Sequence, residues 1–360
     1  MTHTETNDTQ LGLISLTEIT PHPVTGATLS TRQRVEEIIA VAKLADAVGL
    51  DVFAVGEHHR SDYAISNPAM LLGALARETS RIRLTSGTSL IATADPVRLY
   101  QDLATVDLLS GGRAEIIVGR GAFTESFALF GYSLEDYDAL FVDHLDLLLR
   151  ANEQERVTWQ GRFRPALHDA EVTPRAPAEA ADLDRPRREP RERRPRGVDG
   201  PPDDRGPDRR AAQRRGPGVP RLPGGRAGGR ARPGRLRGTG TSSHIQIAPT
   251  SQGARETFYQ HYAHYLADQS RGRFRVSREA YELAASPRGA LYVGSPQEII
   301  DKALAQHELF GHSRILGRMD IGALPYPALS RSVELFANEV APALRKATAD
   351  EADDAAAVSG

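Results

Sequence analysis

The sequence contains no cysteine among its 360 residues. Disulfides, thiolate nucleophiles, zinc fingers and iron–sulfur clusters are therefore excluded, and a metal ion would need histidine or carboxylate ligands. No run approaches the roughly 20 apolar residues of a membrane-spanning helix. Residues 1–10 are polar and lack the apolar core of a secretory signal. We therefore expect a cytoplasmic protein, and its 40% hydrophobic residues are enough to form a large core.

Lysine is also scarce, because 42 of the 45 basic residues are arginine. Nineteen of these arginines fall within residues 175–240, against nine acidic residues, and the same segment holds 11 prolines and 12 glycines. It contains no Phe, Trp, Tyr, Ile, Met or Lys. Such a composition cannot bury enough apolar surface to offset the entropy lost on ordering. We therefore expect this segment to be disordered.

Short apolar runs and helical patterns alternate on both sides of that segment, which is typical of a parallel sheet covered by helices. Asn67-Pro68 and Asp95-Pro96 each combine a capping residue with a proline in the first turn of a helix. Ser295 and Glu298 have the spacing of a capping box. Strands are expected at residues 11–16, 51–55, 82–90, 113–118 and 314–319, and helices at 31–48, 67–75, 95–109, 253–268, 295 onward and 328–344.

Four strand–helix units within about 120 residues predict an α/β fold of the (β/α)₈ TIM-barrel type. The expected division has four parts. Residues 1–174 form the N-terminal part of the barrel, 175–240 the interrupting Arg/Pro/Gly segment, 241–347 the C-terminal part and 348–360 an acidic, alanine-rich disordered tail.

The Arg/Pro/Gly segment has three interpretations: a plain linker, an arginine-rich arm that binds nucleic acid, or a frameshift. GC-rich DNA read out of frame yields Arg, Pro, Gly and Ala. Back-translated and shifted by one base, residues 181–196 permit an apolar strand, a Gly-Gly-Ser loop and the start of a helix. We favour a compensated double frameshift between about Arg175 and Gly240. An intact reading frame on resequencing, with the same residues in homologous chains, would refute it.

The densest group of ionisable residues is Gly56-Glu57-His58-His59-Arg60, directly after the second expected strand. The carboxyl ends of barrel strands are where active sites lie, so these residues are candidates for chemistry. They could also be polar loop residues with structural partners only. Adjacent histidines at a strand end point in opposite directions, and no third ligand is evident, so we expect no metal site.

With that group, the chain resembles the bacterial-luciferase-like family of flavin-dependent monooxygenases. Four blocks carry the resemblance, in order along the sequence. They are residues 45–59, with Ala-Asp-Ala-Val-Gly-Leu-Asp and Glu-His-His; 83–98, with Arg-Leu-Thr-Ser-Gly-Thr and Asp-Pro-Val-Arg; 107–121, with Asp-Leu-Leu-Ser-Gly-Gly-Arg and Gly-Arg-Gly; and 318–336, with Arg-Met-Asp-Ile-Gly and Glu-Leu-Phe.

The resemblance implies a catalytic role for His58, which would hydrogen-bond the flavin–oxygen adduct or shuttle a proton near neutral pH. Glu57 resembles the acid that holds the histidine loop, a structural rather than chemical role. Thr88, Ser89 and Leu90 match the strand end where the isoalloxazine packs. In the family a non-prolyl cis peptide sometimes occurs there, and we expect it between Ser89 and Leu90.

The same resemblance implies that Arg120 meets the FMN phosphate and that Gly119 and Gly121 let backbone approach the cofactor. Where some luciferases carry a reactive cysteine, this chain has Gly119. The family's substrate pocket would be roofed by an aromatic group whose first candidates are Phe123, Phe127 and Tyr132; each could equally be a core residue.

The resemblance implies a luciferase-like monooxygenase that uses reduced FMN, delivered by a flavin reductase, and O₂ to oxygenate a small organic substrate, as a homodimer. F420 is the alternative cofactor. The family's phosphate cradle includes a Gly-Gly-Ser loop that this chain holds only in the shifted frame, so the chain as written is expected to lack most of that cradle and its activity. A non-catalytic protein with a nucleic-acid-binding insert is the alternative from another class; the nine acids and missing aromatics of the insert weigh against it.

Overall fold

We describe a computed structural model of the chain over residues 9–175 and 240–349, which belong to one compact unit. The strands are β1 (Gln10–Ser15), β2 (Val52–Val55), β3 (Arg83–Ser86), β4 (Ser89–Leu90), β5 (Ala114–Glu115), β6 (Val118–Gly119), β7 (Arg156–Trp159), β8 (Leu167–Glu171), β9 (Gly240–Ile247), β10 (Tyr292–Gly294) and β11 (Arg314–Arg318). The helices are α1 (Thr31–Ala47), α2 (Pro68–Glu78), α3 (Pro96–Ser110), α4 (Glu125–Phe130), α5 (Tyr137–Glu153), α6 (Ser251–Gln269), α7 (Arg278–Ala285), α8 (Pro296–Phe310) and α9 (Tyr326–Leu335).

The central sheet confirms the expected parallel α/β arrangement. Its strands follow the order β10-β9-β11-β1-β2-β3-β5, and all its pairings are parallel. The first strand of the chain, β1, lies between β2 and the late strand β11, so the two described ranges share one sheet. Within the described residues, β5 and β10 have one neighbour each in this sheet.

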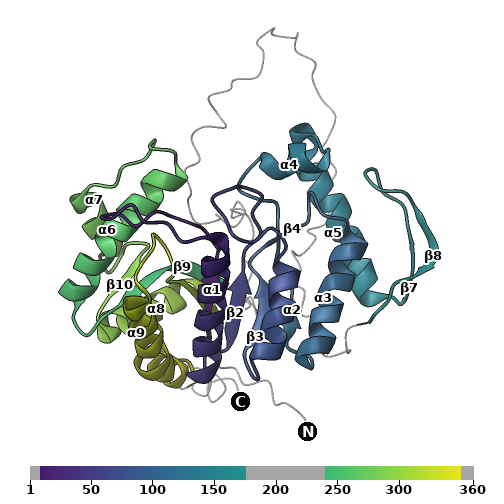
Figure 1. Cartoon of the computed structure of the whole chain (residues 1–360). Helices are drawn as coiled ribbons and strands as arrows, with labels where there is room; N and C mark the ends of the chain where they lie inside the picture. Colours follow the sequence, from purple (N-terminus) through teal and green to yellow (C-terminus); the bar gives the residue numbers. More distant parts are fainter. Residues whose placement is uncertain (1–8, 176–239, 350–360) are drawn as a thin grey trace, which may run out of the picture. The chain divides into compact units, whose positions relative to one another are not determined.

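Helices cover the sheet as the alternating pattern predicts. Figure 1 shows α1, α2 and α3 in turn along the β2–β3 side of the sheet, and adjacent members of this series are in contact. Fully buried side chains from strands and helices, such as Phe53, Leu72, Leu84 and Val333, belong to one continuous apolar core. Burial of these side chains between the sheet and the helices fixes the position of the strands. Polar residues can then lie at the carboxyl ends of the strands, outside this core.

Helix caps explain where several helices begin. Asp95 accepts hydrogen bonds from the N–H groups of Val97 and Arg98, as its position before Pro96 predicts. Asn67 also precedes a proline, but its side chain makes no cap bond. The Ser295 hydroxyl accepts from the Glu298 N–H, whereas the Glu298 carboxylate accepts from Arg255 Nη2 at 2.5 Å. The predicted capping box is therefore only half formed.

Two expected strands are interrupted. The segment predicted as one strand over residues 82–90 forms β3 and β4, which are separated by Gly87 and Thr88. The segment 113–118 likewise divides into β5 and β6, and β6 pairs with β4. The chain after β3 and the chain after β5 thus leave the main sheet and pair with each other, as the parallel strands β4 and β6.

The end of the chain is helical further than expected. After a π-helical turn at Phe336–Val340, residues 341–349 are α-helical. Thr348 is buried, and its hydroxyl donates to Leu344 O and accepts from the Thr9 hydroxyl. The expected tail boundary at residue 348 therefore lies within a packed helix. Residues 176–239 and 350–360 lie outside the described residues. The predictions for the Arg/Pro/Gly segment, including the frameshift, therefore concern residues that the structure does not describe.

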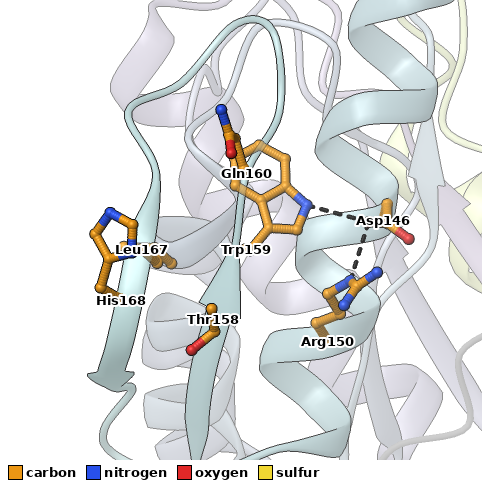
Figure 2. A pocket seen from close by; sticks show the side chains of 7 residues that line it. All are labelled: Asp146, Arg150, Thr158, Trp159, Gln160, Leu167 and His168. Carbon is orange, nitrogen blue, oxygen red and sulfur yellow. Dashed lines mark hydrogen bonds and ion pairs between the residues drawn. The ribbon is translucent and has the colours of Figure 1, made fainter.

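The antiparallel hairpin of β7 and β8 packs beside α5 and encloses a hollow of about 200 Å³. Figure 2 shows Trp159 and Gln160 of the hairpin turned toward this hollow, opposite Asp146 and Arg150 of α5. Asp146 accepts from both the Trp159 indole N–H (3.1 Å) and the Arg150 guanidinium (3.0 Å). None of the sequence-predicted site residues lines this hollow.

A prediction concerns Asp46, near the end of α1. Its carboxylate accepts the backbone N–H groups of Ser80, Arg81 and Ile82 at 2.7 to 2.9 Å and so fixes the entry to β3. Asp46→Ala should lower the free energy of unfolding by about 2–3 kcal/mol, because these donors lose a charged acceptor. Chemical denaturation measures this, with Glu36→Ala on the exposed face of α1 as the control, expected within about 0.5 kcal/mol of wild type.

The same site gives a pH dependence. Burial raises the pKa of Asp46, but the bonds from Ile82, Ser80 and Arg81 outweigh it and hold the pKa below its ordinary value. A depressed folded-state pKa contributes stability above the unfolded pKa of about 4 and loses it as pH falls. The difference in stability between wild type and Asp46→Ala should therefore shrink below about pH 4. A constant difference over that range would contradict this account.

Candidate active site

The polar residues singled out in the sequence gather where β1, β2, β3 and β11 end, and we call this region the mouth. Loops after these strands carry Glu18, the group 57–60, the segment 87–90 and Asp320. Because all these strands are parallel, their carboxyl ends lie at one edge of the sheet. The mouth is thus built from loops that are far apart in sequence.

His58 packs against two aromatic rings. Its imidazole stacks on Tyr63, with ring centroids 3.9 Å apart and planes 9° from parallel, and Phe123 lies 5.6 Å away at a tilt. His58 Nδ1 is buried and makes no hydrogen bond of good geometry with the described residues, although backbone of Leu16 lies near enough to the ring to oppose the fall in its pKa. Other buried atoms of the described residues, such as those of His312, also lack a partner, so the place of Nδ1 at the strand ends is what makes it a candidate for function.

The charge state of His58 follows from its surroundings. Burial, the guanidinium groups of Arg318 and Arg60, and His59 lower its pKa to about 3. The imidazole is therefore neutral at physiological pH. A neutral imidazole has one nitrogen that accepts a hydrogen bond. This differs from the expectation of a histidine that titrates near neutral pH in the free protein.

Glu57 joins the histidine loop to the next strand. One carboxylate oxygen accepts the Leu90 N–H at 3.0 Å, and the other lies 2.9 Å from His59 Nε2. Its side chain is 11% exposed and the His59 side chain 7% exposed. Both oxygens are thus occupied in structural contacts, which leaves Glu57 in the role of holding two mouth segments together.

The segment with Thr88, Ser89 and Leu90 follows β3 into the mouth. A non-prolyl cis peptide occurs here, but it joins Gly87 and Thr88 and not Ser89 and Leu90 as expected. The Ser89 N–H donates to Ile117 O, and Leu90 pairs in register with Gly119. Ser89 is 1% exposed and Leu90 9% exposed, so these two side chains are covered in the structure.

Gly119, Arg120 and Gly121 continue from β6. A Cβ built on Gly119 would overlap the Thr88 side chain, so the two segments approach more closely than any side chain at 119 would permit. Gly121 has φ +85°, in the left-handed region that glycine adopts without strain. Arg120 is half exposed, lies 3.6 Å from an Asp138 oxygen, and stacks on Phe141 at 4.6 Å. Its charge is thus presented beside a close-packed backbone turn.

The three candidate substrate-pocket aromatics are not brought together. Phe123 is half-buried, packs against His58 and Tyr63, and carries the Arg60 guanidinium 4.4 Å over its ring. Phe127 is 1% exposed in a separate apolar cluster, and Tyr132 packs against that cluster. A ring so fully covered lines no open space, so only Phe123 of the three meets the histidine.

Sequence reasoning missed the buried charges of the mouth. Arg34 Nη2 donates to Asp320 Oδ2 at 2.6 Å, and Arg318 Nη2 lies 2.9 Å from Glu18 Oε1. All four residues are less than 9% exposed. Arg318 and Asp320 fall within a block quoted for the family resemblance, but Glu18 and Arg34 belong to no block. In the sequence, the available signal for these pairs was that acidic and basic residues occur near the expected strand ends. Which acid pairs with which arginine is known only from the structure.

Burial shifts the pKa values of these charged groups. Desolvation raises the pKa of Glu18, although Arg318 opposes the shift. Desolvation lowers the pKa of Arg318, but the charges of Glu18 and Asp320 and the contact with Tyr265 together outweigh it and raise that pKa. A buried arginine beside a buried acid therefore stays charged, and its charge acts on the neighbouring imidazoles. His244, in register with Arg318 on the adjacent strand, has its pKa lowered well below the ordinary value by burial and by Arg318.

A family profile described as "Luciferase-like monooxygenase" matches residues 9–188. The chain belongs to this family. Among curated proteins, the oxygenase component of a flavin-dependent trigonelline monooxygenase from Acinetobacter baylyi is 33% identical over 94 residues, 26% of each chain. An uncharacterized protein, y4vJ, from Sinorhizobium fredii is 30% identical over 135 residues, 37% of this chain and 38% of that protein. The matched stretches span less than two fifths of these relatives' lengths.

Solved structures show the same fold over nearly the whole chain. The monooxygenase RslO1 from Streptomyces bottropensis has a TM-score of 0.66 at 22% identity, over 92% of this chain and 99% of that one. The oxygenating constituent of 3,6-diketocamphane monooxygenase from Pseudomonas putida, in complex with FMN, scores 0.64 at 17% identity over 93% and 98%. An F420-dependent secondary alcohol dehydrogenase has a TM-score of 0.58 at 14% sequence identity, over 94% of this chain and 99% of that one. The fold is thus the luciferase-like TIM-barrel type.

Two further observations concern the described residues alone. No group of three His, Asp or Glu side chains there is placed to hold a metal ion. None of the helices in that part of the chain is both long and apolar enough to cross a membrane.

The contacts of Glu57 generate a prediction. Glu57→Ala should lower the free energy of unfolding by about 1–3 kcal/mol, because the Leu90 N–H loses its acceptor in a buried position. Glu57→Gln keeps an amide oxygen for Leu90 and an N–H for His59, so it should retain most of the stability. Thermal and urea unfolding of the two variants measure the difference. Equal losses in both would show that charge, and not the bond to Leu90, is what Glu57 contributes.

Proposed function

We propose that the chain is built as an FMN-dependent monooxygenase that uses reduced FMN and O₂ to oxygenate a small organic substrate. The observation that carries the proposal is His58, whose buried and neutral imidazole presents an unpartnered Nδ1 at the carboxyl end of the barrel strands. In such a reaction one atom of O₂ enters the substrate, the other leaves as water, and the reduced flavin is oxidised.

The residues of the mouth fit a flavin. Among the described residues, His58 Nδ1 makes no hydrogen bond of good geometry, and the acidic side chain paired with Arg120, that of Asp138, lies at 3.6 Å and is 82% exposed. Arg120 would hold the phosphate, since a guanidinium matches phosphate oxygens. Backbone of the Thr88–Leu90 segment would lie along the ring. When bound, reduced FMN would supply the electrons for O₂.

The chain's own groups would position and protect the reacting atoms. His58, neutral because it is buried near Arg318 and Arg60, would accept a hydrogen bond at Nδ1 and hold a proton there once one is delivered. Tyr63 stacks on one face of the imidazole and Phe123 lies beside it, and these contacts would limit the access of water to that face. Glu57 would keep the histidine loop in register with the Leu90 segment.

The proposed cofactor site is incomplete without residues that lie outside the described ranges. The Gly-Gly-Ser loop of the family's phosphate cradle exists only in the shifted frame of residues 175–240. We therefore expect the chain as written to bind reduced flavin weakly and to lack activity. A separate flavin reductase as electron source and a homodimeric assembly are further parts of this proposal.

A second candidate is an F420-dependent oxidoreductase of the same fold. It is favoured by the fold likeness to the F420-dependent secondary alcohol dehydrogenase. F420 is a hydride carrier, so this function would need no O₂. Oxygen dependence of turnover separates the two candidates.

A titration tests the proposed cofactor. The chain as written and a version with the alternative frame restored from 175 to 240 are titrated anaerobically with reduced FMN and with reduced F420, followed by absorbance. The restored chain should bind FMN at least about tenfold more tightly than the chain as written, a difference of about 1.4 kcal/mol. Preference for F420 in the restored chain would replace the first candidate by the second. Binding of neither cofactor would remove both.

A substitution tests the proposed role of His58. In the restored chain, His58→Ala should lower turnover by about 10²–10⁴-fold, the range of a lost proton-transfer group, while FMN affinity changes far less. Stopped-flow flavin oxidation and product formation measure the two quantities separately. Equal activity of the variant and its parent would remove His58 from the mechanism.

A further inference from the structure

The buried ion pair of Arg318 and Glu18 lies near His58, but neither side chain is among the groups that would contact the flavin or the substrate. Both side chains are at least nine-tenths buried, and Nε of Arg318 has no hydrogen-bond partner among the described residues. Burying two charges is costly, and such pairs often contribute little net stability. Their presence therefore points to a role beyond stability.

A first route of contacts runs from Arg318 through Glu18 to Tyr63. Glu18 and Tyr63 form an isolated antiparallel bridge. The Ile19 N–H donates to Asp62 O and the Ala64 N–H donates to Thr17 O, both at 2.8 Å. The backbone of the Glu18 loop thus fixes the backbone at Tyr63, and Arg318 holds that loop through the Glu18 carboxylate at 2.9 Å.

A second route runs through helix α6. Arg318 Nη1 donates to the Tyr265 hydroxyl at 2.8 Å, and its guanidinium lies 4.5 Å over the Tyr265 ring. Gln269 follows four residues later, on the same face of the helix. Its Oε1 accepts the Tyr63 hydroxyl at 2.6 Å. Arg318 therefore orients the helix that holds the other end of the Tyr63 side chain.

Both routes converge on the ring that stacks on His58 at 3.9 Å. We propose that Arg318, held between Glu18 and Tyr265, is a positioning residue that acts through His58: it fixes the wall on which the imidazole packs and places its positive charge near that ring. The link to catalysis rests on the function proposed above, whereas the effect on His58 is a property of the protein alone.

The charges around His58 agree with this role. After burial, Arg318 is the strongest influence that lowers its pKa, ahead of Arg60 and His59 on its own loop. The Arg60 charge is directly paired, because Asp62 accepts from it at 2.9 and 2.5 Å. Tyr63 is uncharged, because burial raises the pKa of its hydroxyl well above the ordinary value. Arg318 and Arg60 are both paired with an acid, and Arg318 is the cation with the larger effect on the imidazole.

The test compares variants of Arg318 that differ in charge. Arg318→Met alone would strand the buried Glu18 carboxylate, so the double variant Glu18→Gln/Arg318→Met removes both charges together. Arg318→Lys keeps the positive charge. Arg113→Met is the matched control, because Arg113 also donates to buried carbonyls of Ala76, Thr79 and Ile82, at the opposite ends of the strands.

The readout is the His58 resonance in ¹³C-histidine-labelled full-length protein without flavin, assigned with His58→Gln and followed from pH 4 to 8. Wild type should show no titration in most of this range, consistent with a pKa of about 3. The double variant should raise that pKa by up to about one unit, because Arg318 lowers the His58 pKa whereas Glu18 is not among the named causes of the shift. Arg318→Lys and Arg113→Met should leave it low. A folded double variant with wild-type titration would overturn the proposal.

A second variant keeps the test decisive if the double variant does not fold. Gln269→Leu breaks the α6 route without changing a charge, and it should shift or broaden the His58 resonance while the imidazole stays neutral. An unchanged resonance would overturn the positioning role. In the frame-restored chain the double variant should lower kcat more than it raises KM, with rescue by Arg318→Lys. If the frame-restored chain does not bind flavin, the proposed function is contradicted. The inference about Arg318 and His58 is unaffected by that result, because the His58 resonance is measured without flavin.

Discussion

The mouth of this barrel depends on the mutual neutralisation of two buried guanidinium groups and two buried carboxylates. Arg34 with Asp320 and Arg318 with Glu18 join α1, the loop after β1 and the end of β11 at one point. Each charge alone would be too costly to bury, so none of these segments can shift without exposing the others to that cost. The arrangement fixes loops from opposite ends of the sequence in one geometry, and the histidine loop packs against it.

Much of the scaffold follows from the sequence because it rests on local rules. Periodic apolar residues, proline in the first helical turn and Asp95 as a cap act within a few residues, and the structure follows them. The parallel α/β sheet follows from the alternation of such segments. The departures have local causes as well. The strand expected over residues 82–90 breaks at Gly87 and Thr88, where the cis peptide lies, and Asn67 has the right position for a cap without making the bond.

The site could be predicted only in part, because its contacts join residues that no local rule connects. His58 and Glu57 stand out in the sequence as ionisable groups after a strand. The family resemblance supplies the proposed roles. The partners of Arg318 could not be found this way, since Glu18 lies 300 positions earlier and Tyr265 on a distant helix. Phe127 illustrates the alternative that the sequence left open, because this aromatic lies near the site in sequence but packs in a separate apolar cluster.

The close approach of Gly119 and Thr88 constrains how this site can vary. A Cβ at 119 would overlap the Thr88 hydroxyl, so a larger residue at 119 would require Thr88 to rotate or to be replaced by a smaller residue. The two positions should therefore covary. A side chain at the end of β6 therefore fits only if the Thr88 side chain moves aside, and the bulk of the mouth at this point is shared between two neighbouring strands.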